Sequence, residues 1–215
     1  MYQIKNLNFN YKNGKLIFKD TSLFLAKDKI TGLSGKNGSG KTTFCRLLCG
    51  LLSGYEGKIS IEGKNLQNLI TAEISQSITY IKQEPLANIV AATPSEDLAI
   101  WFHRFSLKDP NQNELIESAL TEYRIAELKE KPVWELSSGE IKRINLAALL
   151  LNSHKYWIID EPLAGLDRNL QNIFLQILSR KPGSGALIIS HDQTNLRPFL
   201  DHIYHIENYR IEKMR

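Results

Sequence analysis

Short apolar runs, separated by polar residues and an Asn-Gly pair, open the chain. Alternating apolar and polar residues predict a strand over residues 2–9. The Asn13-Gly14 pair is a strong turn signal, and two further short strands are expected at 16–18 and 23–25. Residues 30–33 read as a short buried strand. An antiparallel beginning followed by a parallel core is the simplest account.

The apolar spacing changes to three and four residues over 42–52, which predicts a helix. Beyond it, short runs rich in strand-forming residues return. They predict strands at 58–61, 77–81, 156–160 and 186–190, and a closing hairpin from 202–206 and 209–211.

From Pro85 to about Ser153 the strand signals vanish, which predicts an inserted helical segment. Residues 94–107 and 110–129 read as helices, the second with a start at Asp109-Pro110. Three aromatic residues lie close together within this segment: Trp101, Phe102 and Phe105. They form either its small core or part of a docking groove.

Composition excludes several classes of protein. The chain has 215 residues and a net charge of +4, with basic and acidic residues interspersed, so no nucleic-acid surface is indicated. Cys45 and Cys49 are expected to be buried apolar residues rather than a metal or redox pair. The longest apolar run, 146–151, is far below the roughly 20 residues that span a bilayer, and no signal peptide is visible. We expect a reduced, cytosolic chain.

The segment Gly35–Thr42 reads Gly-Lys-Asn-Gly-Ser-Gly-Lys-Thr and fits the phosphate-binding loop pattern. Its glycines permit a backbone whose N–H groups point inward as an anion-binding nest. Lys41 would bring a charge to the β- and γ-phosphates, and the Thr42 hydroxyl would bind Mg²⁺. The alternative is an ordinary glycine-rich turn, but a strand before and a helix after favour the phosphate loop. The candidate nucleotide-binding residues here are Gly35, Lys36, Asn37, Gly38, Ser39, Gly40, Lys41, Thr42 and Thr43.

A second chemical anchor is the apolar strand 156–160, which ends in Asp160 and is followed by Glu161. A buried strand with a carboxylate at its end is typical of an Mg²⁺-binding element in phosphate-loop enzymes. Asp160 would hold the metal, and Glu161 would orient or deprotonate the attacking water. An acidic turn without chemistry is the alternative.

Other candidate residues stand at the ends of predicted elements. Tyr11 is either a base-stacking residue or an exposed tyrosine beside a hairpin, and Gln83 lies at a strand end where ligands collect in α/β sheets. Ser137 and Glu140 form a capping box at the start of a helix that runs to about residue 151. The capped N-terminal end of this helix could also receive the γ-phosphate of another nucleotide. His191 follows a core strand and is either structural or a transition-state contact.

The ordered set resembles the nucleotide-binding subunit of ATP-binding cassette (ABC) transporters over about residues 2–204. Gly35–Thr42 resembles the Walker A loop and 156–160 the Walker B strand, with Asp160 as metal ligand. Glu161 matches the catalytic glutamate, and His191 the switch histidine.

Four further short motifs of the family also have counterparts in this chain. Tyr11 matches the adenine-stacking aromatic residue, and Gln83 the Q-loop glutamine, which contacts the metal. The stretch 164–167 resembles the D-loop. The stretch 136–140 resembles the family signature, with Ser137, Ser138 and Gly139 as nucleotide contacts.

The resemblance implies a fold and an assembly. The fold class is α/β, with a RecA-like P-loop NTPase core, an N-terminal antiparallel part and an inserted α-helical subdomain. One domain covers 1–215, with its core at 1–84 and 154–215 and the subdomain at 85–153. Two ATPase subunits, identical or different, would sandwich two ATP molecules with Mg²⁺, each site pairing one Walker A loop with the other chain's signature.

Two signature residues depart from the usual pattern. Ser138 stands where glycine is usual, and Glu140 where glutamine is common. The Ser138 side chain would either crowd the partner's phosphate or add a hydroxyl donor.

A finer resemblance covers 83–99, which looks like the corresponding segment of energy-coupling-factor (ECF) and cobalt-type importer ATPases. It implies ATP-driven import of a vitamin or metal ion through an integral membrane coupling subunit. This chain would lie on the cytoplasmic face of the membrane. Neither direct nucleic-acid binding nor membrane insertion is expected. The alternatives are a soluble ABC ATPase acting on ribosomes or nucleic acid, and an exporter or lipid-extraction ATPase.

Overall fold

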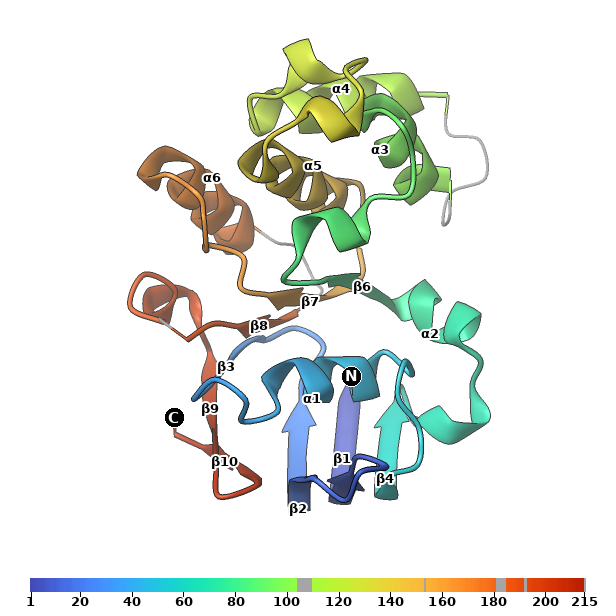
Figure 1. The fold of residues 1–215 in the computed structure, drawn as a ribbon, viewed down its shortest axis with the longest axis vertical. Coiled ribbons are helices and arrows are strands. Elements are labelled where there is room, and N and C mark those ends of the chain that lie inside the picture. Colours follow the sequence, from blue (N-terminus) through green and yellow to red (C-terminus); the bar gives the residue numbers. More distant parts are fainter. Residues whose placement is uncertain (104–109, 153, 181–184, 192, 215) are drawn as a thin grey trace. The chain divides into compact units, whose positions relative to one another are not determined.

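The computed structural model (Figure 1) describes residues 1–103, 110–152, 154–180, 185–191 and 193–214. The chain divides into two compact units. The first, the sheet unit, comprises residues 1–80, 155–161 and 183–215, and the second, the helical unit, comprises 81–154 and 162–182. The assignment of the whole chain to one domain stays a prediction.

The sheet unit begins with an antiparallel sheet of strand order β2-β1-β4-β5. Its strands are β1 (Tyr2–Asn10), β2 (Leu16–Leu25), β4 (Glu56–Ile61) and β5 (Lys64–Asn65). The prediction of two separate strands at 16–18 and 23–25 was wrong, because β2 is continuous. Asp20 interrupts its alternation with a φ of 44°, and the Asp20 backbone N–H donates to the Asn8 side chain at 2.9 Å. This irregularity made one bulged strand look like two.

A second, mostly parallel sheet has the strand order β10-β9-β3-β8-β7-β6. Its strands are β3 (Ile30–Gly35), β6 (Ile78–Ile81), β7 (Tyr156–Asp160), β8 (Ala186–Ile189), β9 (His202–Glu207) and β10 (Arg210–Lys213). Strand β8 pairs in parallel with both β3 and β7. The carboxyl ends of these three strands therefore meet at one edge, where ligands bind in α/β sheets.

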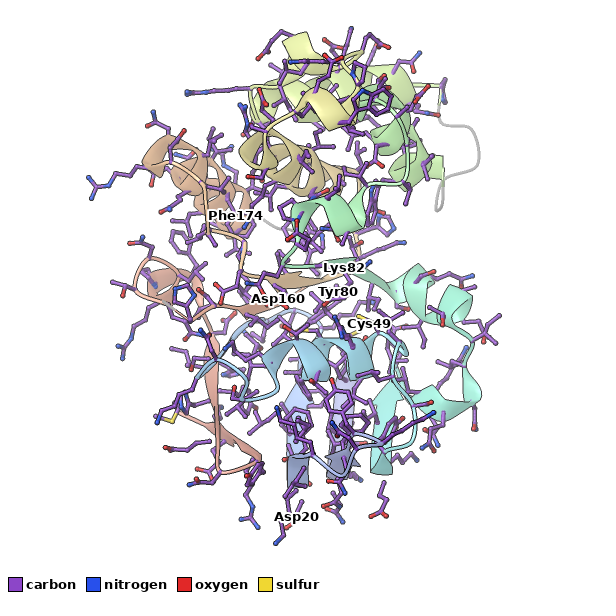
Figure 2. The ribbon with its side chains drawn as sticks, in the orientation of Figure 1. Asp20, Cys49, Tyr80, Lys82, Asp160 and Phe174 are labelled. Carbon is purple, nitrogen blue, oxygen red and sulfur yellow. The ribbon has the colours of Figure 1, made fainter. Side chains whose placement is uncertain are left out.

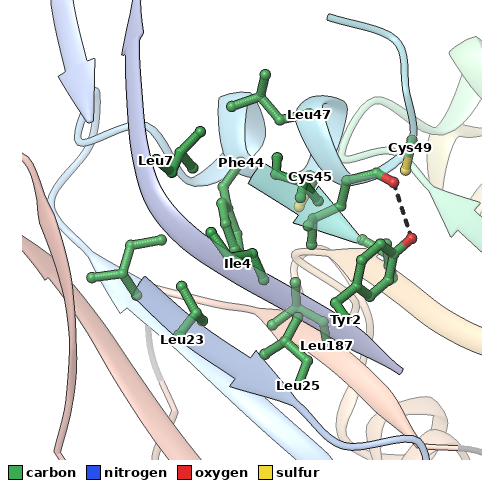
Figure 3. Packing of buried hydrophobic residues seen from close by; sticks show 14 of the residues in the cluster. Tyr2, Ile4, Leu7, Leu23, Leu25, Phe44, Cys45, Leu47, Cys49 and Leu187 are labelled. Carbon is green, nitrogen blue, oxygen red and sulfur yellow. Dashed lines mark hydrogen bonds between the residues drawn. The ribbon is translucent and has the colours of Figure 1, made fainter. Parts of the chain in front are cut away.

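Helix α1 (Lys41–Leu48) packs its apolar face into the core of this unit, where Phe44, Cys45 and Leu47 are fully buried. Figure 3 shows this packing, with the Tyr2 hydroxyl donating to the Leu48 carbonyl at 3.0 Å. Both Cys45 in α1 and Cys49 just after it are free and buried, as expected of small apolar residues. The helix ends four residues before the predicted position 52, since Gly50 takes a φ of 66°. The short helix α2 (Thr71–Ser77) was not predicted.

The helical unit contains α3 (Pro94–His103), α4 (Gln112–Glu122), α5 (Ser138–Leu151) and α6 (Arg168–Ser179). The short 3₁₀ turn η2 (Pro85–Asn88) precedes α3, and η3 (Ala126–Leu128) and η4 (Val133–Glu135) lie between α4 and α5. Trp101 and Phe102 are buried in this unit, which favours the small-core interpretation. Phe105 and the predicted end of its helix at 107 lie outside the described residues.

The prediction of one helix over 110–129 was wrong. Helix α4 ends at Glu122, and Arg124 adopts a left-handed φ of 55°, which a continuing helix does not allow. Apolar residues continue at helical spacing beyond this break into η3, and that continuity misled the prediction.

None of the helices in the described part of the chain is long and apolar enough to cross a membrane.

Candidate active site

The phosphate-loop segment connects β3 to α1 in a conformation that requires glycine. Gly40, the N-cap of α1, has a φ of 108°, and a Cβ there would lie 2.6 Å from a methyl group of Ile17. Gly35 has a φ of 154°, and its Cβ would lie 2.7 Å from the Ser39 hydroxyl. Side chains at these two positions would displace the loop, so the sequence pattern has a direct steric cause.

Lys41 folds back over the loop. Its ammonium donates to the carbonyls of Gly35 at 2.7 Å and Lys36 at 3.1 Å, and the residue is 9 % exposed. The Ser39 hydroxyl is buried and, within the described part of the chain, makes no hydrogen bond. A buried hydroxyl without a partner is costly, so a ligand that supplies one fits here. Nucleotide phosphates offer such acceptors.

Thr42 and Asp160, the predicted metal residues of the sheet unit, are in direct contact. The Thr42 hydroxyl donates to a carboxylate oxygen of Asp160 at 2.7 Å. Asp160 closes β7 (Figure 2), and its burial raises the pKa of its carboxyl group, an effect that the Thr42 hydrogen bond opposes. Paired hydroxyl and carboxylate oxygens are the hard ligands that Mg²⁺ prefers, so the pair fits this ion.

Glu161 directly follows β7 and has an unusual backbone, with a φ of 52°. Its backbone N–H donates to the Ile189 carbonyl at 2.9 Å, which ties it to the end of β8. The Glu161 carboxylate accepts the His191 backbone N–H at 2.9 Å and lies 3.0 Å from the His191 Nδ1 atom. The two predicted catalytic residues are therefore a contacting pair.

Ser190 joins this pair, although sequence analysis gave it no role. Its hydroxyl donates to the other Glu161 carboxylate oxygen at 3.3 Å, and the residue is 4 % exposed. The available signal was a hydroxyl side chain at the end of an apolar strand, next to the candidate histidine. With Ser190, the end of β8 holds both oxygens of Glu161.

Lys36, Asn37 and His191 border the same hollow of about 580 Å³. The His191 side chain is 65 % exposed, so it can meet a ligand there while it contacts Glu161. The phosphate loop, the metal pair and the Glu161 cluster thus gather at the carboxyl edge of one parallel sheet.

Tyr11 lies half-buried just after β1. Its hydroxyl is 2.8 Å from the Thr43 hydroxyl in α1, and its ring meets Phe9 edge-on. The structure therefore brings Tyr11 to the start of the helix that follows the phosphate loop. This placement is compatible with the predicted stacking role, which stays a prediction.

In the helical unit, Ser137 is the N-cap of α5. Its hydroxyl accepts the Glu140 backbone N–H at 3.3 Å, and its own N–H donates to the Glu140 carboxylate at 2.7 Å. The predicted capping box and the helix end at 151 are confirmed. The hydrogen bonds from the Ser137 hydroxyl and N–H hold the pKa of the Glu140 carboxyl group below its ordinary value. Ser138 is exposed and Gly139 half-buried at the start of this helix.

A buried lysine links α5 to the stretch 164–167. The Lys142 ammonium donates to the Ala164 carbonyl at 2.7 Å, and Lys142 is 8 % exposed. Asp167 then caps α6 by accepting the Leu170 N–H at 2.9 Å. The Lys142 contact was not predicted, because nothing in sequence spacing indicates which carbonyl a lysine reaches.

Gln83 is exposed and follows β6 by two residues. The buried Asn88 holds this turn, since its side chain accepts the Lys82 N–H at 2.9 Å and donates to the Lys82 carbonyl at 3.1 Å. Gln83 and the residues from Ser137 to Gly139 belong to the helical unit, so their part in the site of the sheet unit stays a prediction.

Comparison with known proteins gives a consistent result. The family model described as "ABC transporter" matches residues 18–164. The energy-coupling factor transporter ATP-binding protein EcfA1 of Thermotoga maritima is 29 % identical, and the match covers 97 % of this chain and 79 % of that protein.

Solved structures resemble the chain throughout its length. CbiO1 of Clostridium perfringens, described as part of the ABC transporter complex cbiONQ, superposes with a TM-score of 0.81 at 25 % identity over 98 % of this chain and 86 % of its own. A dimeric ATP-binding cassette with bound ADP and Pi superposes with a TM-score of 0.87, and the match covers 100 % of this chain and 99 % of that one. At 21 % identity, the second likeness concerns the fold alone.

Proposed function

We propose that this chain, which belongs to the ABC transporter family of ATP-binding proteins, powers an importer of the energy-coupling-factor type. It is an ATPase and an ATP-binding subunit of an ABC transporter. The proposal adds the kind of transporter, the partners, and the roles of individual residues.

The observation that carries the catalytic part is the clustering of two carboxylates with their partners at one sheet edge. Thr42 and Asp160 would hold Mg²⁺, which when bound neutralises phosphate charge. Glu161 would accept a proton from the attacking water, and His191 and Ser190 would hold both oxygens of its carboxylate in place. General-base catalysis of this kind contributes roughly 10²- to 10⁴-fold.

The phosphate loop would bind the nucleotide through its N–H groups and through Lys41. At about 4 Å, a unit charge pair is worth roughly 4 kcal/mol at an effective dielectric near 20. A neutral hydrogen bond nets only about 1 kcal/mol. Lys41 therefore contributes more than any single loop N–H, and Ser39 supplies an additional buried hydroxyl.

The importer assignment rests on relatives. An ECF transporter ATPase matches nearly the whole chain, and the CbiO1 structure is described as part of a transporter complex. Together with the resemblance of residues 83–99, these two relatives support a second ATPase subunit and an integral membrane coupling subunit as partners. The same reasoning supports a place at the cytoplasmic face of the membrane and a vitamin or metal ion as cargo.

Affinity isolation of the tagged chain from detergent-solubilised membranes of its host tests this assignment, with co-purifying proteins identified by mass spectrometry. The proposal predicts a coupling-type membrane protein together with a small substrate-binding membrane protein. Recovery with ribosomes or nucleic acid and without a membrane partner would contradict the importer role, and the ATPase assignment would stand.

A further inference from the structure

The turn between β9 and β10 carries an aromatic residue in a conformation that favours glycine. Glu207 pairs with Arg210, so Asn208 and Tyr209 form a two-residue turn, with φ angles of 49° and 64°. Such turns strongly prefer Asn-Gly, because both central residues are left-handed. Asparagine suits the first position, whereas a bulky tyrosine at the second is disfavoured. Strained residues of this kind concentrate at functional sites.

This turn is held next to the phosphate loop from two sides. Ile206, just before it, pairs in parallel register with Gly35, the first residue of the loop. The Tyr209 carbonyl accepts the Lys19 backbone N–H at 2.9 Å, which fixes the turn to β2. Its position therefore follows from backbone pairing alone.

A hollow of about 390 Å³ lies between the start of β2, the phosphate loop and this turn. This volume falls within the roughly 300–1,000 Å³ typical of small-molecule sites. Lys15, Lys36 and Tyr209 all border it, and Tyr209 is 53 % exposed. Two basic side chains and an exposed aromatic ring next to a phosphate loop match a ligand that carries both phosphate and a flat or apolar group.

We infer that the β9–β10 turn is part of the nucleotide site and that the Tyr209 ring contacts the nucleoside portion of the bound nucleotide. Lys15 and Lys36 provide positive charge on the same side. Tyr209 is then a nucleoside-binding residue beside the predicted stacking residue Tyr11, and its contact explains why tyrosine is tolerated where glycine would fit better. The inference rests on the nucleotide site proposed above at the phosphate loop.

The decisive variant is Tyr209→Gly, measured in the full chain by calorimetric titration with ADP and with inorganic tripolyphosphate. Glycine suits the left-handed position, so thermal unfolding should occur at an unchanged or higher temperature. Loss of one aromatic contact to a base or ribose should weaken ADP affinity about tenfold and leave tripolyphosphate affinity unchanged. Tyr209→Phe keeps the ring and should bind ADP as the wild type does.

Unchanged ADP affinity in Tyr209→Gly, or an equal loss for ADP and tripolyphosphate, would overturn the inference. Lys41→Ala separates this result from a failure of the proposed site. If Lys41→Ala loses ADP binding and Tyr209→Gly does not, only the contact by Tyr209 is wrong. If Lys41→Ala binds ADP normally, the phosphate loop is not the nucleotide site, and both proposals fail.

Discussion

The Thr42 hydroxyl donates a 2.7 Å hydrogen bond to the Asp160 carboxylate, although 118 positions separate the two residues along the chain. The contact joins the phosphate loop to the end of β7 and places two hard oxygen ligands side by side. In the proposed metal site, Mg²⁺ binding would therefore depend on both segments.

Asp160→Asn should abolish Mg²⁺-dependent hydrolysis. Asparagine has nearly the same shape and can still accept the Thr42 hydrogen bond, but it lacks the charge that a divalent cation requires. We expect ATP turnover to fall by about 10²-fold or more at any Mg²⁺ concentration. A Mg²⁺ titration of phosphate release checks this, and recovery of full activity at high Mg²⁺ would contradict the role of Asp160 in holding the metal.

The same substitution should stabilise the fold at neutral pH. Burial raises the folded-state pKa of the Asp160 carboxyl group, so the folded chain binds its proton more tightly than the unfolded chain does. Stability is then lost as pH rises through the two pKa values, and the cost is present above them. Asparagine removes this cost.

Thermal unfolding of wild type and Asp160→Asn without nucleotide or Mg²⁺, compared between pH 7.5 and pH 4, measures the effect. The variant's advantage should be largest at pH 7.5 and shrink as pH falls. A stability advantage of the variant that grows toward acid pH would contradict a raised pKa of Asp160 in the folded chain.

Ser190→Ala should lower turnover without affecting nucleotide affinity. The variant loses one hydrogen bond to Glu161, a net value of about 1 kcal/mol, which corresponds to roughly five- to tenfold in rate if the carboxylate is less well held. Ser190→Thr keeps the hydroxyl and is the matched control. Equal rates for Ser190→Ala and wild type would remove Ser190 from the positioning role.

Replacement of the capping glutamate should alter acid stability. The Glu140 pKa is depressed in the folded chain, so its contribution is complete above the unfolded pKa of about 4.3 and is lost as pH falls through the folded pKa. Glu140→Gln should be less stable than wild type at pH 7, and the difference should diminish below about pH 4. A denaturant titration at each pH measures the difference in the free energy of unfolding. A difference that does not change with pH would contradict the capping role of the Glu140 carboxylate.

The segments that carry the candidate site residues were the part of the molecule that the sequence predicted best. Glycine spacing, a strand before it and a helix after it predicted the Gly35–Thr42 loop, because its geometry is local and sterically enforced. The strand 156–160 and the capping box at Ser137 were also predicted correctly.

Errors arose where local irregularities interrupt a regular pattern. A bulge at Asp20 split one strand into two in the prediction, and a left-handed Arg124 ended a helix whose apolar spacing continued. Neither residue carries a sequence signal as strong as glycine or proline. Contacts between distant residues were equally inaccessible, since the Ser190 and Lys142 hydrogen bonds depend on tertiary packing.

Glu161→Gln tests the central claim most directly. The amide keeps the size of the side chain but cannot accept a proton, so ATP should still bind while hydrolysis falls by roughly 10²- to 10⁴-fold. The variant should then accumulate as an ATP-bound dimer, detected by size-exclusion chromatography with light scattering. Glu117→Gln, an exposed glutamate that pairs with Lys129 at 2.9 Å, is the matched control and should hydrolyse ATP normally.

The measurement is phosphate release by both variants at saturating ATP and Mg²⁺, followed by sizing of the same samples. We expect phosphate release by Glu161→Gln to fall by roughly 10²- to 10⁴-fold, with a stable dimer, and Glu117→Gln to turn over ATP normally. Normal phosphate release by Glu161→Gln would contradict the assignment of Glu161 as the catalytic base.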